Sequence, residues 1–198
     1  MSPVPSTREP VVLVHGIWNT SKVFRRLTKN LEAAGFEVHA WDSSPNDGSA
    51  PLLALAEQLA ERVEATLGGE RSFSLVGFSM GGLVSRCYLQ RLGGVRRVRK
   101  FVSISSPHQG TFWGRFGKKA GIAEMSPTSE LLLALNSKME ELAQVPCLSL
   151  YTPWDLMILP ARSSHFGVGE TRTFTVPLHQ WMPDDERVGR ATVEFLSR

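Results

Sequence analysis

The chain has 198 residues, of which 42% are hydrophobic and 21% are charged, a composition that predicts one globular domain with a full core behind a loose lead over residues 1–9. No apolar run reaches the ~20 residues that cross a bilayer, and the lead lacks a basic-then-apolar signal pattern, so we expect a cytoplasmic protein. The net charge of +3 comes with basic runs at 96–100 and 115–119, which we interpret as solvated surface. The alternative is a weak preference for anionic membrane surfaces, and no nucleic-acid partner is predicted.

Strand and helix patterns alternate along the whole chain. Residues 10–15 form a continuous apolar run, as expected of a parallel strand covered on both faces. The expected strands are 10–15, 37–41, 73–76, 100–104, 146–151 and an edge strand 171–176; the expected helices are 23–34, 51–67, one that follows residue 79 and ends at Gly93, 129–142 and 184–196. This alternation predicts an α/β fold with about six mostly parallel strands and helices on both faces. In such sheets the site lies beyond the carboxyl ends of the strands.

The most informative motif is G-F-S-M-G at residues 77–81, which stands between an apolar strand and a helical pattern. It is the sequence of a nucleophile elbow, a turn so tight that the positions two residues from the serine must lack bulk. Gly77 and Gly81 meet that requirement. We therefore predict that Ser79 is a nucleophile above the amino end of the next helix, where developing negative charge is favoured. The alternative is an ordinary glycine-rich turn.

A serine hydroxyl needs a base to take its proton, and the base needs a partner that fixes its tautomer. For an elbow serine the expected chain order is serine, acid, histidine. His15 and His39 precede the serine, so neither is expected to be the base. We expect His15 to shape the turn in which it lies. His108 leaves no strand-end acid between itself and the serine, and His165 lies in a loose loop. His179 follows the last strand, so we predict that it is the base; the alternative is a surface-loop histidine.

The acid is expected between Ser79 and His179, at the end of a strand. Asp155 is the only aspartate in that interval, and it follows the predicted strand 146–151. We predict that Asp155 orients the histidine, against the alternative that it only caps a helix or turn. Asp42, also near a strand end, precedes the serine and is the second choice.

Backbone amides and aromatic side chains complete the predicted site. An oxyanion hole needs two N–H groups, and we assign them to Met80, which follows the nucleophile, and to Ile17, in the loop after the first strand. Four aromatic or apolar residues are expected to line an acyl pocket: Trp18, Phe78, Trp113 and Phe116. The alternative for these side chains is plain core packing.

The two cysteines, Cys87 and Cys147, lie far apart in the sequence. We expect buried free thiols and no disulfide. No spacing typical of a metal site occurs, so no metal is predicted.

Three segments resemble one family: His15-Gly16 after the first strand, G-F-S-M-G-G at the elbow, and S-S-P-H-Q-G-T after the next strand. Together they are similar to the α/β-hydrolase lipases, with the closest likeness to the small bacterial triacylglycerol lipases and esterases. The resemblance implies a Ser-Asp-His triad, ester hydrolysis through an acyl-enzyme, and no metal or other cofactor. Two strands that open the family sheet have no counterpart before Val11, so we expect a minimal sheet, and Leu178 stands where such lipases often have glycine.

The first functional hypothesis is a carboxylic-ester hydrolase that acts on small-molecule or lipid esters. With few residues in 110–125, a large lid cannot be built, so short to medium acyl chains are favoured. A thioesterase or acyltransferase would use the same acyl-enzyme and differ only in the leaving or accepting group. The third hypothesis is a non-catalytic acyl-binding scaffold, which we expect to lack a triad member.

Overall fold

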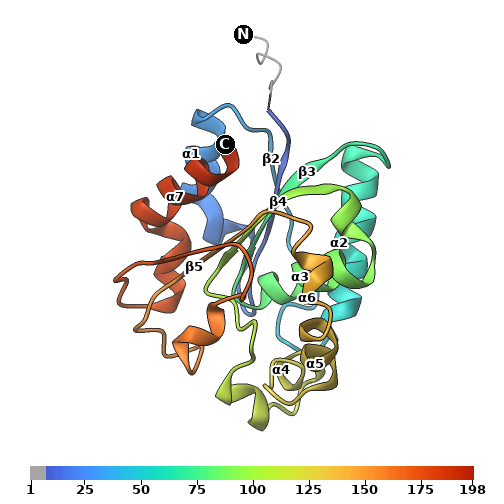
Figure 1. Cartoon of the computed structure of the whole chain (residues 1–198), viewed down its shortest axis with the longest axis vertical. Coiled ribbons are helices and arrows are strands. Elements are labelled where there is room, and N and C mark those ends of the chain that lie inside the picture. The colour runs from blue at the N-terminus through green and yellow to red at the C-terminus, as the bar shows by residue number, and fades with distance from the viewer. Residues whose placement is uncertain (1–7) are drawn as a thin grey trace.

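The computed structural model describes residues 8–198 (Figure 1), so residues 1–7 of the expected lead lie outside the described range. Within that range six strands form one sheet in the order β2-β1-β3-β4-β5-β6, and every neighbouring pair is parallel. The strands are β1 (Val11–Val14), β2 (Val38–Ala40), β3 (Phe73–Phe78), β4 (Val98–Ile104), β5 (Cys147–Tyr151) and β6 (Glu170–Thr173). The prediction of an α/β fold with about six parallel strands is confirmed.

Helices cover both faces of this sheet. The α-helices are α1 (Arg25–Ala33), α2 (Leu52–Leu67), α3 (Met80–Arg91), α4 (Ala120–Ala123), α5 (Glu130–Asn136), α6 (Met139–Leu142) and α7 (Glu186–Ser197). Short 3-10 helices are η1 (Ser21–Phe24), η2 (Gly94–Arg96), η3 (Phe112–Phe116), η4 (Ala161–Ser164) and η5 (His179–Asp184). Figure 1 shows α1 and α7 on one side of the sheet and α2 and α3 on the other.

The two-sided cover explains the apolar run of the first strand. Val12 and Val14 pack with the α2 and α3 side, whereas Val11 and Leu13 pack with the α1 and α7 side. All four are buried. Because alternate side chains of a strand point to opposite faces, a strand covered on both sides needs apolar residues at every position.

The order in which strands are added to the sheet reverses at β1. The crossover through α1 leads to β2 on one side of β1, and the crossover through α2 leads to β3 on its other side. Parallel sheets open a crevice at the carboxyl ends of the strands where the order reverses in this way. The loop after β1 and the turn after β3 therefore meet at one place.

Two predicted elements differ from the observed ones. The expected helix 129–142 is divided into α5 and α6, because the Gln90 side-chain amide donates to the carbonyls of Leu135 and Lys138 at 2.8 and 2.9 Å and occupies acceptors that a continuous helix would use. The expected strand 171–176 ends at Thr173. The carbonyl of Val176 accepts a hydrogen bond from the Thr152 side chain, in the loop after β5, and not from a neighbouring strand.

None of the helices over residues 8–198 combines the length and the apolar character that a membrane span requires.

Candidate active site

Ser79 occupies a strained turn between β3 and α3. Its φ of 54° and ψ of −126° lie in a region that non-glycine residues seldom adopt, and its amide donates to the carbonyl of Ile104 at 2.9 Å. A Cβ at Gly81 would lie 2.1 Å from the carbonyl oxygen of Val14, and one at Gly77 would lie 2.6 Å from the next turn of backbone. These glycines are therefore required by close approach of the backbone.

A chain of hydrogen bonds runs from Ser79 to a buried carboxylate. The Ser79 Oγ lies 2.9 Å from His179 Nε2, and His179 Nδ1 lies 2.7 Å from Asp155 Oδ2. With the proton on Nδ1, the ring donates to the carboxylate and accepts from the serine hydroxyl. The ring also packs against Phe78, with centroids 5.0 Å apart. The three side chains come from the loops after β3, β5 and β6 and are all buried.

Asp155 is held in place by the carboxylate oxygen that does not contact the histidine. Its Oδ1 accepts hydrogen bonds from the amides of Met157 and Ile158, both at 2.9 Å, which leaves Oδ2 directed at the histidine. Asp155 is 1% exposed, so water does not replace these donors. The carboxylate can therefore fix both the tautomer and the orientation of the imidazole.

Thr152 joins the loop of the acid to the loop of the base. Its hydroxyl donates to the carbonyl of Val176 at 2.8 Å, three residues before His179, and accepts from the amide of Trp154 at 3.3 Å. The side chain is fully buried. Sequence reasoning did not single out Thr152, and the only available signal was a small hydroxyl residue directly after a buried strand.

Two backbone amides next to the nucleophile in the fold or the chain are without an acceptor. The loop after β1 approaches so closely that a Cβ at Gly16 would lie 3.3 Å from Ser79 Oγ. In residues 8–198 the amides of Ile17 and Met80 have no hydrogen-bond partner. Met80 is the first residue of α3, where helix geometry leaves the amide without an internal acceptor. Both are available to a developing oxyanion.

The loop after β1 is fixed by hydrogen bonds to residues 43–46. The Trp18 amide donates to the carbonyl of Asn46 at 2.7 Å. His15 donates from Nδ1 to the carbonyl of Gly16 at 2.9 Å, and its Nε2 accepts from the Ser43 amide at 3.0 Å. His15 thus shapes this turn, and its ring nitrogens hydrogen-bond within the loops and not to the serine hydroxyl.

An apolar cavity of about 70 Å³ lies beside Ser79. It is lined by Ile17, Trp18, Ser79, Thr111, Trp113, Gly114, Ile122, Met125, Met157 and Ile158. Of the four residues expected there, Trp18 and Trp113 line it. Phe78 does not, because it is fully buried in the core on the α1 and α7 side. Phe116 does not either, because it turns outward at the end of η3 and is 68% exposed.

Residues 110–126, which we call the wall, close one side of this cavity. On one flank the Phe112 amide donates to the carbonyl of Leu159 at 2.9 Å, and the Trp113 indole donates to the carbonyl of Leu156 at 3.0 Å. These bonds attach the wall to the loop that carries Asp155.

The wall is attached on its other flank as well. The Gly121 amide donates to the carbonyl of Gly48 at 3.0 Å, and Lys119 forms an ion pair with Asp47 at 2.6 Å. A Cβ at Gly121 would lie 2.5 Å from the carbonyl of Ala50, so the two segments pack backbone to backbone. The wall is thus attached to the body of the molecule on both flanks.

The remaining histidines have other partners. His108 is fully buried, hydrogen-bonds Ser103 Oγ at 2.6 Å, and stacks on Phe166 with centroids 3.7 Å apart. Burial, together with the nearby Arg86 cation, holds the pKa of His108 well below its ordinary value. His165 is exposed and hydrogen-bonds a threonine hydroxyl. Neither contacts Ser79, which agrees with the order used to select His179.

Arg86 lies on α3 beneath this region and is fully buried. Its guanidinium donates to Gln90, to Asn136 and to the carbonyl of His108, all neutral acceptors. Burial lowers the pKa of Arg86 to about 10. The arginine therefore ties α3 to the segment 108–136 that forms the wall and its continuation.

Other expected alternatives lie apart from the site. Asp42 accepts the amide of Ser21 at 2.6 Å and has no bond to His179. Cys87 and Cys147 are buried free thiols, as predicted. In the part of the chain that the structure describes, no group of three or more His, Cys, Asp or Glu side chains could hold a metal ion.

Comparison with known proteins identifies the family. A sequence profile described as the alpha/beta hydrolase fold matches residues 9–181. The chain belongs to this α/β-hydrolase family. The α/β-hydrolase is 30% identical to a triacylglycerol lipase of Pseudarthrobacter phenanthrenivorans over 124 residues, which cover 56% of this chain and 37% of the lipase. It is 31% identical to a human lysosomal thioesterase over 134 residues, which cover 65% of this chain and 42% of the thioesterase.

The fold has a solved counterpart of similar size. A lipase of Bacillus licheniformis in its mature form aligns with a TM-score of 0.78 over 98% of this chain and 94% of the lipase, at 13% identity. By contrast, the chain spans less than half the length of the two curated relatives. The resemblance to lipase and esterase members is thus confirmed at the level of the family and its fold.

Proposed function

We propose that this α/β-hydrolase cleaves carboxylic esters through an acyl-enzyme formed on Ser79. The observation that carries the proposal is the continuous hydrogen-bonded chain from Ser79 through His179 to Asp155, with an apolar cavity beside the serine hydroxyl. This arrangement supplies a nucleophile, a base, an orienting carboxylate and a place for an acyl group in one location. A non-catalytic scaffold has no use for such an arrangement.

In the first half-reaction His179 Nε2 accepts the proton of Ser79 Oγ while the oxygen bonds to the carbonyl carbon of the ester. Asp155 stabilises the imidazolium that forms. The carbonyl oxygen becomes an oxyanion that accepts hydrogen bonds from the amides of Ile17 and Met80. The tetrahedral intermediate then collapses, the C–O bond to the alcohol breaks, and His179 gives its proton to the departing alkoxide oxygen.

The second half-reaction repeats these steps with water. His179 takes a proton from a water molecule, the hydroxide attacks the acyl-serine carbonyl, and the same two amides receive the oxyanion. Collapse breaks the bond to Ser79 Oγ, which recovers its proton from His179. The products are a carboxylic acid and the free enzyme.

The cavity supports acyl groups of short to medium length as substrates. Its volume of about 70 Å³ is small beside the hundreds of cubic ångströms of a typical ligand pocket. Ile122 and Met125 of the wall close it. A longer chain would extend past Trp113 and Met157, which are both partly exposed at the rim. The lipase relative supports a lipid ester as the natural class of substrate.

A thioester substrate is the second candidate. It is favoured by one observation, the 31% identity to the human lysosomal thioesterase. The acyl-enzyme would be the same, but a thiolate departs more readily than an alkoxide and depends less on the proton from His179. The two candidates therefore differ in how strongly the rate depends on that proton donor.

The test is hydrolysis of p-nitrophenyl esters from acetate to palmitate, with Ser79→Ala as the blank, beside acyl-coenzyme A thioesters of the same chain lengths. Turnover on the esters that disappears in the variant supports the proposal. Turnover on thioesters alone assigns the second candidate. Absence of both, together with no labelling of Ser79 by a fluorophosphonate, refutes the proposed acyl-enzyme.

A further inference from the structure

Large apolar side chains are exposed on one part of this molecule. In residues 8–198 ten large hydrophobic residues are exposed, and all except Leu133 lie in loops that follow the carboxyl ends of β1, β4, β5 and β6. We call these nine residues the mouth surface: Trp18, Phe112, Trp113, Phe116, Trp154, Leu156, Met157, Leu178 and Trp181. They are between 40% and 73% exposed, and they include four of the five tryptophans of the chain.

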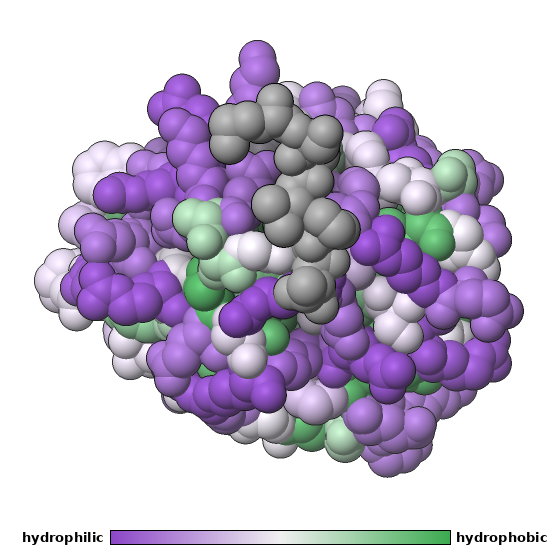
Figure 2. Space-filling view, turned by 90° about the horizontal axis from the view of Figure 1, so that it is seen from above, coloured by the Kyte–Doolittle hydropathy of each residue, from purple (hydrophilic) through white to green (hydrophobic). Residues whose placement is uncertain are grey.

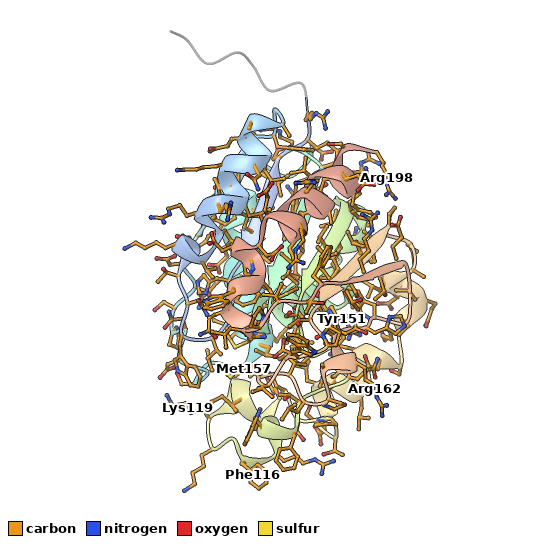
Figure 3. The ribbon with its side chains drawn as sticks, turned by 90° about the vertical axis from the view of Figure 1, so that its left-hand side faces the viewer. Phe116, Lys119, Tyr151, Met157, Arg162 and Arg198 are labelled. Atoms are coloured by element: carbon orange, nitrogen blue, oxygen red, sulfur yellow. The ribbon has the colours of Figure 1, made fainter. Side chains whose placement is uncertain are left out.

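The mouth surface includes part of the cavity lining. Trp18, Trp113 and Met157 line the cavity and reach solvent. The Phe112 ring contacts Trp113 and Phe116, with centroids 5.5 and 5.2 Å apart. Figure 3 shows Phe116 and Met157 toward the end of the molecule that is remote from Arg198.

The opposite end of the molecule has a different character. Figure 2 shows the face at the amino ends of the strands, and hydrophilic residues predominate there. Arg99, at the amino end of β4, is exposed and forms an ion pair with Glu9. The exposed large apolar side chains are thus gathered at one end of the molecule and are not scattered over its surface.

Unpaired positive charge accompanies the apolar side chains. Arg115 lies in η3 directly beside Phe116, Lys118 follows two residues later, and both are exposed. In the described residues neither has an ion-pair partner, whereas the adjacent Lys119 is paired with Asp47. Aromatic side chains with adjacent unpaired cations are the combination that binds the interface of a membrane with anionic headgroups.

We propose that the mouth surface docks on an anionic lipid surface, with Trp113 and Phe116 at headgroup depth and Arg115 and Lys118 against the lipid phosphates. A protein partner would need a surface of matching shape, whereas a lipid surface accommodates exposed aromatic side chains of any arrangement, and its phosphates match the unpaired cations. Docking places the opening of the cavity directly over the lipid, and the wall keeps the attachments described above. Because docking does not require turnover, this proposal stands apart from the proposed hydrolysis.

The experiment measures partition onto vesicles with the Ser79→Ala variant, which cannot hydrolyse the lipid through that serine. Vesicles of phosphatidylcholine alone are compared with vesicles of phosphatidylcholine and phosphatidylglycerol in equal parts, by co-sedimentation and tryptophan emission. We expect stronger binding to the anionic vesicles, a blue shift of the emission, and weaker binding as salt is raised. Each basic residue near an anionic leaflet is worth roughly fivefold in partition, so Arg115→Gln with Lys118→Gln should weaken binding roughly 25-fold.

Matched variants separate the mouth surface from net charge and general hydrophobicity. Arg99→Gln with Arg190→Gln removes the same charge from other surfaces, and Leu133→Ser removes an exposed apolar side chain of α5. Both should bind as the parent does, whereas Phe116→Ser should weaken binding to both kinds of vesicle. Melting temperatures verify that each variant is folded.

Three outcomes overturn the proposal. The first is no partition onto the anionic vesicles. The second is equal partition onto neutral and anionic vesicles, which removes the role of Arg115 and Lys118. The third is self-association that depends on Phe116 without vesicle binding, which would assign the mouth surface to a second copy of the chain.

Discussion

Replacing Asp155 by asparagine tests the hydrogen-bonded chain from Ser79 through His179 to Asp155. The substitution exchanges one carboxylate oxygen for an NH2 group. The carboxylate accepts three hydrogen bonds, two on Oδ1 from the amides of Met157 and Ile158 and one on Oδ2 from His179 Nδ1. Asparagine has the same shape but only one acceptor oxygen. Because two backbone donors face one side, that oxygen is expected to remain there and the NH2 group to face the histidine.

The histidine must then change tautomer. An NH2 group opposite Nδ1 requires Nδ1 to accept, so the ring proton moves to Nε2, which can no longer take the proton of Ser79. If the asparagine amide rotated by 180°, its oxygen would face Nδ1 and the original tautomer would return. Its NH2 group would then face the amides of Met157 and Ile158, at a cost of about 1–3 kcal/mol for each unsatisfied group. We therefore expect Asp155→Asn to lower kcat by about 10⁴, which corresponds to ~5.5 kcal/mol in the activation free energy.

The assay is hydrolysis of a short p-nitrophenyl ester, with the melting temperature measured beside it. Asp42→Asn is the matched control, because Asp42 is bonded to the Ser21 amide and not to the histidine. Its activity should equal that of the parent. A rate for Asp155→Asn within about tenfold of the parent would refute the orienting role, and a collapse of the melting temperature would show that Asp155 acts mainly in the fold.

Further predictions concern packing, pH and thiols. Gly81→Ala should lower the melting temperature by roughly 6–12 °C, since the new Cβ would lie 2.1 Å from a carbonyl oxygen of β1, whereas Gly69→Ala, which meets only a flexible side chain, should change little. The depressed pKa of His108 keeps it neutral in the folded state, while the unfolded chain binds a proton below about pH 6.5, so stability is lost as pH falls. Between about pH 7 and about pH 5 the parent should lose up to ~2 kcal/mol more than His108→Gln, measured by urea unfolding. Burial raises the pKa of both Cys87 and Cys147 to about 12, so neither should react with a disulfide reagent until the chain is unfolded.

Each of these results has a clear opposite. An unchanged melting temperature in Gly81→Ala would mean that α3 can move away from β1 at no cost. Parallel stability curves for the parent and His108→Gln would mean that the buried ring binds a proton in the folded state as readily as in the unfolded chain. Rapid labelling of either cysteine in the native protein would mean that the core opens at that position.

The sequence predicted the sheet well, because its signals are local. Each strand is a short apolar run with a turn at its end, and the elbow glycines are required by the close approach of β3 and α3. The constraint of chain order then selected Asp155 and His179 for Ser79, and the structure brings these side chains into hydrogen-bond contact. The chain order of the triad therefore identified residues that motif spacing alone does not.

What the sequence missed depends on contacts between distant segments. Thr152 has no motif, since its role exists only when the loops after β5 and β6 lie together. The break between α5 and α6 arises from Gln90, about fifty residues earlier in the chain. Phe78 and Phe116 are aromatic residues near the site in sequence, but one faces the core and the other solvent, a distinction that hydrophobicity does not encode.

The double attachment of the wall has a kinetic consequence. A cavity whose side is bonded to two loops of the body needs no opening step before an ester reaches Ser79. Progress curves on a dissolved ester should then begin at full velocity, with no lag. Below the solubility limit of the ester, the rate should also rise smoothly with its concentration.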